Sequence, residues 1–61
     1  MKSLTAAEII ALINARQSEA IELSRTFKRL GKRKMANWYD GEVMACSTLL
    51  FRIEEAANGK A

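Results

Sequence analysis

An apolar pattern of helical period runs through this sequence on both sides of Gly31, and it restricts the chain to folds made of helices. No proline occurs in the 61 residues, so nothing interrupts a helix before Gly31. Apolar residues fill the a and d positions of a heptad in this first half, except at Arg16. They are Ala6, Ile9, Ile13, Ala20, Leu23, Phe27 and Leu30. We predict a first helix over about residues 6–30.

Local signals mark both ends of this helix. Thr5 and Glu8 match a capping box, in which each side chain bonds the backbone amide of the other residue. At the far end, Gly31 stands where a glycine in the left-handed conformation commonly closes a helix. We expect a tight turn at residues 31–32 to follow.

The second half of the sequence permits two interpretations. In the first, one helix spans about residues 33–58 and ends at Asn58-Gly59. In the second, Asp40 caps a shorter helix that starts at Gly41, and the preceding segment is a loop or a separate short helix. The heptad phase continues across Gly41, which favours the continuous helix. The apolar positions of that phase are Ala36, Tyr39, Val43, Cys46, Leu50, Ile53 and Ala57.

Two helices joined by a short turn predict an all-α fold, an antiparallel αα-hairpin that forms a single domain over residues 1–61. A core of this size rarely supplies more than ~3–5 kcal/mol, so small domains add disulfides, a metal or self-association. One cysteine and no histidine exclude the first two in their usual forms. We therefore expect a homo-oligomer, with a dimeric four-helix bundle favoured.

A second group of apolar residues lies roughly opposite the heptad positions of the second helix. Its members are Trp38, Met44, Ala45 and Phe51, which we expect to cluster into one exposed seam. Exposed apolar patches usually mark binding surfaces, and the simplest partner is a second copy of the chain. Trp38, Met44 and Phe51 are therefore the candidate interface, either between copies or with a partner protein.

Arg16 interrupts the apolar face midway along the first helix. Its methylene groups can stay covered while the charge reaches the rim, with Glu19 or Glu54 as the partner. Alternatively, a polar residue at such a position fixes the register or the oligomeric state of a helical bundle.

The sequence lacks the patterns of catalytic and metal sites. Histidine, the commonest general base, is absent, and Cys46 lies among the apolar heptad positions, where a small buried side chain is expected. There is no glycine-rich phosphate loop and no metal-spaced cysteine pair. No run approaches the ~20 apolar residues that cross a bilayer, and a lone cysteine fits a reducing interior. We predict a cytoplasmic protein that is not an enzyme and that binds no cofactor, metal or membrane.

Basic residues concentrate around the predicted turn, where positions 25–34 hold six bases and no acid. The bases are Arg25, Lys28, Arg29, Lys32, Arg33 and Lys34. The remaining four bases and seven acids give the rest of the chain a charge of −3, against +3 for the whole. Such a cluster can neutralise phosphates, with Trp38 and Tyr39 nearby to stack on bases. It can equally serve only to end a helix and to solubilise a turn.

The layout resembles that of the plasmid-encoded Rop proteins, in which hairpins of this length dimerise into a bundle that binds paired RNA loops. The resemblance covers layout and size but no residue motif, so it assigns no site residues here. We predict a small, non-enzymatic, self-associating helical module of regulatory role that binds another protein. The alternative is a regulator that binds RNA or DNA through the basic residues 25–34.

Overall fold

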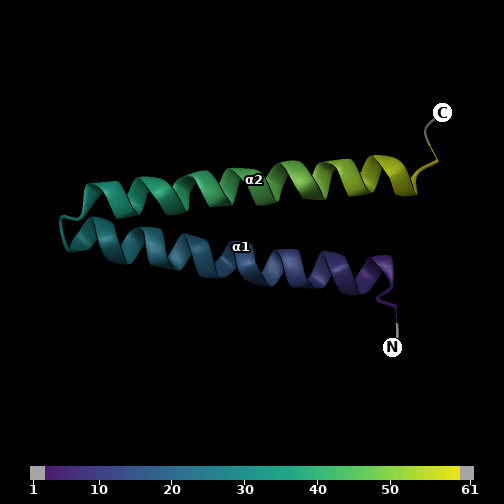
Figure 1. Ribbon diagram of the computed structural model, residues 1–61, viewed down its shortest axis with the longest axis horizontal. Coiled ribbons are helices and arrows are strands. Elements are labelled where there is room, and N and C mark those ends of the chain that lie inside the picture. The colour runs from purple at the N-terminus through teal and green to yellow at the C-terminus, as the bar shows by residue number, and fades with distance from the viewer. Residues whose placement is uncertain (1–2, 60–61) are drawn as a thin grey trace.

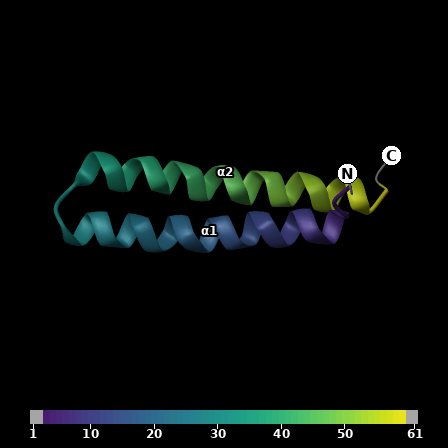
Figure 2. The same ribbon diagram turned by 60° about the horizontal axis from the view of Figure 1, so that its bottom comes forward.

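The computed structural model describes residues 3–59, which form two helices (Figure 1). Helix α1 spans Ala6–Arg29 and helix α2 spans Arg33–Ala57. The helices lie side by side and antiparallel, so the start of α1 lies at the same end of the molecule as the end of α2 (Figures 1 and 2). The all-α helical hairpin predicted from the sequence is therefore confirmed.

Helix α1 begins with the capping box. The hydroxyl oxygen of Thr5 accepts a hydrogen bond from the backbone amide of Glu8 at 3.1 Å. In return, the amide of Thr5 donates to Glu8 Oε1 at 2.8 Å. Two amides at the start of the helix are thus satisfied without help from another segment.

The turn between the helices closes on Gly31, whose φ is +76°. The amide of Gly31 donates to the carbonyl of Lys28 at 3.1 Å, and the amide of Lys32 donates to the carbonyl of Phe27 at 2.8 Å. These two bonds form a Schellman motif, which satisfies the last carbonyls of α1 and reverses the chain within a few residues. The short reversal is what sets α2 antiparallel to α1.

Helix α2 continues through Gly41 without a break. Of the two sequence interpretations, the structure has the continuous helix, and the one in which Asp40 caps a new helix is wrong. The reason is that the Asp40 side chain is engaged elsewhere, as the acceptor of a hydrogen bond from Ser24 of α1. Gly41 is exposed and nothing lies near the place of its missing side chain, so it disturbs no packing. The helix ends at Asn58, followed by Gly59 with a φ of +64°.

The core between the helices is narrow and made of small residues. Ala20, Ala36 and Cys46 are its buried apolar members, and Ser24 is buried beside them. Within residues 3–59, no large side chain is fully buried. Ten large apolar side chains are exposed instead: Leu4, Ile9, Leu12, Ile21, Leu30, Met35, Trp38, Met44, Leu49 and Phe51. A hairpin alone therefore leaves ten of its large apolar side chains exposed to water.

An aromatic cluster packs near the turn. The rings of Phe27 and Tyr39 stack across the two helices, with centroids 5.8 Å apart and planes within 1°. Trp38 meets Tyr39 edge-on, with centroids 4.9 Å apart. Tyr39 thus packs between two other rings, as its heptad position predicts, and it is not free to stack on a nucleic-acid base.

Candidate interaction surfaces

The outer half of α2 carries two separate apolar strips, so Trp38 does not lie on the same strip as Met44 and Phe51, and the role of these three residues as an interface stays a prediction. All three side chains are exposed, by 62%, 71% and 60%. Met44 and Phe51 are seven positions apart and share one side of the helix, but Trp38 precedes Met44 by six positions, which places it about 120° away. Polar residues and Gly41 lie between the strips: Lys34, Asn37, Gly41, Thr48, Arg52 and Glu55.

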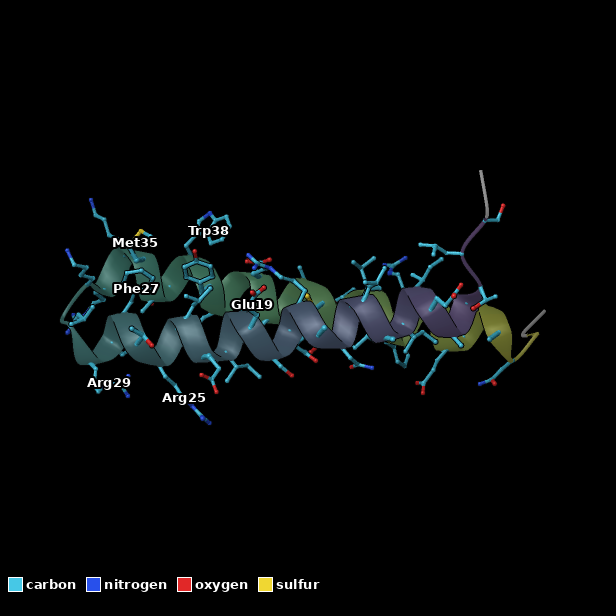
Figure 3. The ribbon with its side chains drawn as sticks, turned by 90° about the horizontal axis from the view of Figure 1, so that it is seen from below. Glu19, Arg25, Phe27, Arg29, Met35 and Trp38 are labelled. Atoms are coloured by element: carbon cyan, nitrogen blue, oxygen red, sulfur yellow. The ribbon has the colours of Figure 1, made fainter. Side chains whose placement is uncertain are left out.

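Two helices lying side by side present two broad faces, and each apolar strip belongs to one of them. We call the first the Trp38 face. Helical spacing places on it the residues Leu12, Leu23, Leu30, Met35, Trp38, Leu49 and Ile53. Figure 3 shows Met35 and Trp38 projecting from this side of the hairpin, while Arg25 projects from the other. Both helices contribute to the face, and it is the more apolar of the two.

An ionic cluster lies in the middle of the Trp38 face. Arg16 donates two hydrogen bonds to Glu42 of α2, from Nε to Oε2 and from Nη2 to Oε1, the second at 3.0 Å. It also donates from Nη1 to Glu19 at 2.7 Å. The bonds from Glu42 and then Glu19 raise the pKa of Arg16 further above its ordinary value, so the guanidinium stays charged. Of the two partners that the sequence suggests, Glu19 is confirmed and Glu54 is not among the residues that Arg16 bonds, while Glu42 is a partner that the sequence analysis did not name.

Arg16 keeps its charge at the edge of the interface between the helices. Its side chain is 41% exposed, and that of Glu42 is 23% exposed. The expectation that its charge reaches the rim is therefore met, with a fork-to-fork pair in place of an isolated contact. Because the pair joins α1 to α2 by two bonds, it also ties the register of the two helices.

The second face, which we call the Met44 face, is more polar. Its apolar residues are Ile10, Ile21, Met44 and Phe51. Between them, the Gln17 amide donates to Ser47 Oγ at 2.7 Å and to the Val43 carbonyl at 3.2 Å. An open hollow of about 320 Å³ lies nearer the turn, lined by Ile21, Ser24, Arg25, Lys28, Asp40, Val43 and Met44.

Asp40 connects this hollow to the basic residues. Its carboxylate accepts a hydrogen bond from Ser24 at 2.5 Å and lies 3.5 Å from the ammonium of Lys28. The hydrogen bond from Ser24 lowers the pKa of Asp40 below its ordinary value, and the nearby charge of Lys28 lowers it further. Sequence reasoning missed this acid because it lies outside positions 25–34 and reaches the cluster only when α2 folds back.

The six basic residues gather at the turn end of the hairpin, which we call the basic tip. Lys28 is the one member that forms an ion pair with a described residue, its partner being Asp40. Lys28 and Arg33 also line an open hollow of about 200 Å³ beside Gly31. All six side chains are exposed. The structure thus leaves the six side chains of the basic tip open to solvent around the turn.

The described residues offer little for covalent or metal chemistry. Cys46 is buried between the helices, where a thiol behaves as a small apolar group. Over residues 3–59, no three Asp, Glu or Cys side chains come together in a group suited to a metal ion. In the same span, neither helix has an apolar stretch of the length and hydropathy needed to cross a membrane.

Comparisons with protein families, with curated proteins and with solved structures found no match to this chain. The resemblance to Rop proteins therefore rests on helix number and length alone.

Proposed function

We propose that this protein is a non-enzymatic, self-associating helical module that acts by binding another protein. One observation carries the proposal: within residues 3–59 no large side chain is fully buried, while large apolar side chains lie exposed on both faces of the hairpin. Patches of that kind on a small soluble chain mark contact surfaces. The free, buried cysteine fits the reducing cytoplasm as the place where the module works.

Each face of the hairpin serves one role, self-association or the binding of a partner protein. A hairpin that stacks one face on a second copy covers that face and forms a four-helix bundle. The other face then remains outward for a different partner. Because the Trp38 face is the more apolar, it serves self-association, and the Met44 face with its polar bonds serves the partner protein.

Light scattering on face-directed variants tests self-association. We expect the wild type at tens of micromolar to have the mass of two chains. Leu12→Glu/Leu49→Glu places two charges on the Trp38 face and should reduce the mass to one chain. Thr48→Glu is the matched control and should leave the dimer intact, because Thr48 belongs to the polar ridge of α2, by which we mean the polar residues between its two apolar strips. A wild type that stays helical and monomeric at this concentration would contradict the proposal.

Site-directed photo-crosslinking tests the partner protein. A photoreactive amino acid at Phe51 lies on the Met44 face, and one at Thr48 lies on the ridge beside it. We expect one discrete heterologous protein to be crosslinked from position 51 and not from position 48. Equal crosslinking from both positions, or from neither, would argue against the Met44 face as the partner site.

The basic tip supports a second candidate function, the binding of RNA or DNA. The specific observation is that five of its six side chains form no ion pair with a described residue, so their charges are available to phosphates. Lys and Arg side chains that contact phosphates release counterions, which makes the affinity fall steeply with salt.

Titration against labelled duplex DNA and structured RNA over a salt series separates this candidate from the first. If nucleic acid is the ligand, Arg29→Ala/Lys32→Ala/Arg33→Ala should lower the log–log salt slope by about two to three. Arg52→Ala removes a base outside the tip and is the matched control, with no change expected. No binding by micromolar wild type at low salt would remove the candidate.

A further inference from the structure

We infer that two copies of this chain pair antiparallel through their Trp38 faces, with the basic tip of each copy beside the open end of the other. By open end we mean the end of the hairpin opposite the turn, where α1 begins and α2 ends. The inference rests on the proposed self-association, and it fixes the partner, the face and the orientation.

The apolar surface on the Trp38 face is sufficient for a stable dimer. Leu12, Leu30, Met35, Trp38 and Leu49 are each between 44% and 62% exposed. Side chains of this size and exposure leave on the order of 600 Å² of apolar surface per copy. Two copies would then bury about 1,200 Å², which reaches the range of specific protein interfaces. The Met44 face offers fewer large side chains and surrounds them with polar bonds.

Charge decides the orientation. A twofold axis in the interface allows two arrangements of face-to-face hairpins, one with both tips at the same end and one with the tips at opposite ends. The parallel arrangement sets the two basic tips at the same end of the bundle, where like charges repel. The antiparallel arrangement separates the two tips by the length of the hairpin and sets each at the other copy's open end, where the described residues include three acids, Glu8, Glu54 and Glu55, and one base, Arg52. Opposite charges at a rim favour the antiparallel dimer.

The ionic cluster lies where the twofold axis would cross. Arg16 and Glu19 flank the middle of α1, and Glu42 lies within one turn of the middle of α2. In an antiparallel dimer the two clusters therefore face each other at the centre of the bundle. Paired polar groups at such a level penalise shifted registers, because a shift would place the charges against apolar side chains.

Distances between spin labels test the orientation on the intact chain. In a Cys46→Ala background, a label is placed either at Lys34→Cys, near the tip, or at Thr48→Cys, near the middle of α2. Both positions lie on the polar ridge and belong to neither face. In the antiparallel dimer the label-to-label distance at position 34 should exceed that at position 48 by about 20 Å, from the rise per residue of a helix.

Three other outcomes would contradict the proposed dimer. Equal distances at the two positions would mean a parallel dimer and would overturn the inference while leaving self-association intact. The absence of any intermolecular distance at tens of micromolar would overturn self-association itself. A dimer that survives Leu12→Glu/Leu49→Glu and dissociates with Met44→Glu/Phe51→Glu would show that the opposite face pairs, and would also overturn the inference.

Discussion

The hydroxyl of Ser24 donates a hydrogen bond to Asp40 at 2.5 Å and joins a buried position of α1 to the edge of α2. Ser24 is surrounded by the small residues of the core, and within residues 3–59 every buried side-chain polar atom has a hydrogen-bond partner. The bond thus serves two purposes: it satisfies a buried hydroxyl, and it holds the one acid that reaches the basic tip. Both consequences can be measured.

Replacing Ser24 by Ala should raise the pKa of Asp40 toward its ordinary value, because the hydroxyl is the main group that stabilises the carboxylate. Replacing Lys28 by Ala should raise it less, because that ion pair is longer and solvated. Carbon-detected NMR titration of the Asp40 carboxyl measures both shifts. A larger effect of Lys28→Ala would show that charge, and not the hydrogen bond, controls this acid.

The same bond gives folding stability a defined pH dependence. Because the pKa of Asp40 is lowered by folding, the stabilisation is fully present above the ordinary value of 3.8. It is lost as the pH falls through the lower value of the folded state. Denaturation at a series of pH values should therefore show wild type and Ser24→Ala converging below about pH 4. A constant difference down to pH 2 would contradict this linkage.

Replacing two of the glycines by alanine should change the stability of the hairpin in opposite directions. Gly31 has a φ of +76°, a conformation that costs an L-residue about 1 kcal/mol or more, so Gly31→Ala should destabilise the hairpin. Gly41 lies in the exposed interior of α2 with nothing near its missing Cβ, so Gly41→Ala should stabilise by about 0.5–1 kcal/mol. Thermal unfolding followed by circular dichroism compares them. Equal signs would mean that the turn or the helix is not as described.

The helices and their ends were predictable because the signals are local. A capping box, a left-handed glycine and a helical apolar period each act within a few residues, so Thr5, Glu8 and Gly31 are interpretable without knowing the rest of the fold. The continuity of α2 was left open because Asp40 is a good helix cap in isolation. What removes it from that role is a contact with Ser24, sixteen positions away.

The surfaces were harder to predict because they depend on which sides of two helices meet. Trp38 and Met44 are six residues apart, so they lie about 120° apart around α2. Only the position of α1 beside α2 shows that their two strips belong to different faces. The partner of Arg16 shows the same difficulty. Glu42 bonds Arg16 across the hairpin. Glu54 lies twelve residues further along α2, about 18 Å along the helix and about 120° around it toward the Met44 face, so it lies far from Arg16.

The ionic cluster should add little to the stability of the dimer but should restrict the dimer to one arrangement. In Arg16→Leu/Glu42→Leu, apolar side chains replace a pair that the dimer would desolvate, so we expect the dimer to be at least as stable as the wild type. Its register should become mixed, because the layer that penalises shifted registers is gone. Spin labels at position 34 should then report two distances in place of one. A single unchanged distance would show that the tip charges alone set the register.

The thiol of Cys46 should react slowly in the native protein because it is 7% exposed between the helices. A buried group reacts only through opening of the hairpin, so labelling by a soluble thiol reagent should be more than about tenfold slower than for an exposed cysteine. The matched control is Thr48→Cys in the Cys46→Ala background, which places one thiol on the polar ridge two positions away.

Cys46 lies on the side of α2 nearer the Trp38 face. Dilution that separates the dimer should therefore speed the labelling of Cys46 and leave the labelling of position 48 unchanged. Equal rates at the two positions in concentrated protein would mean that the helices do not enclose Cys46 in solution.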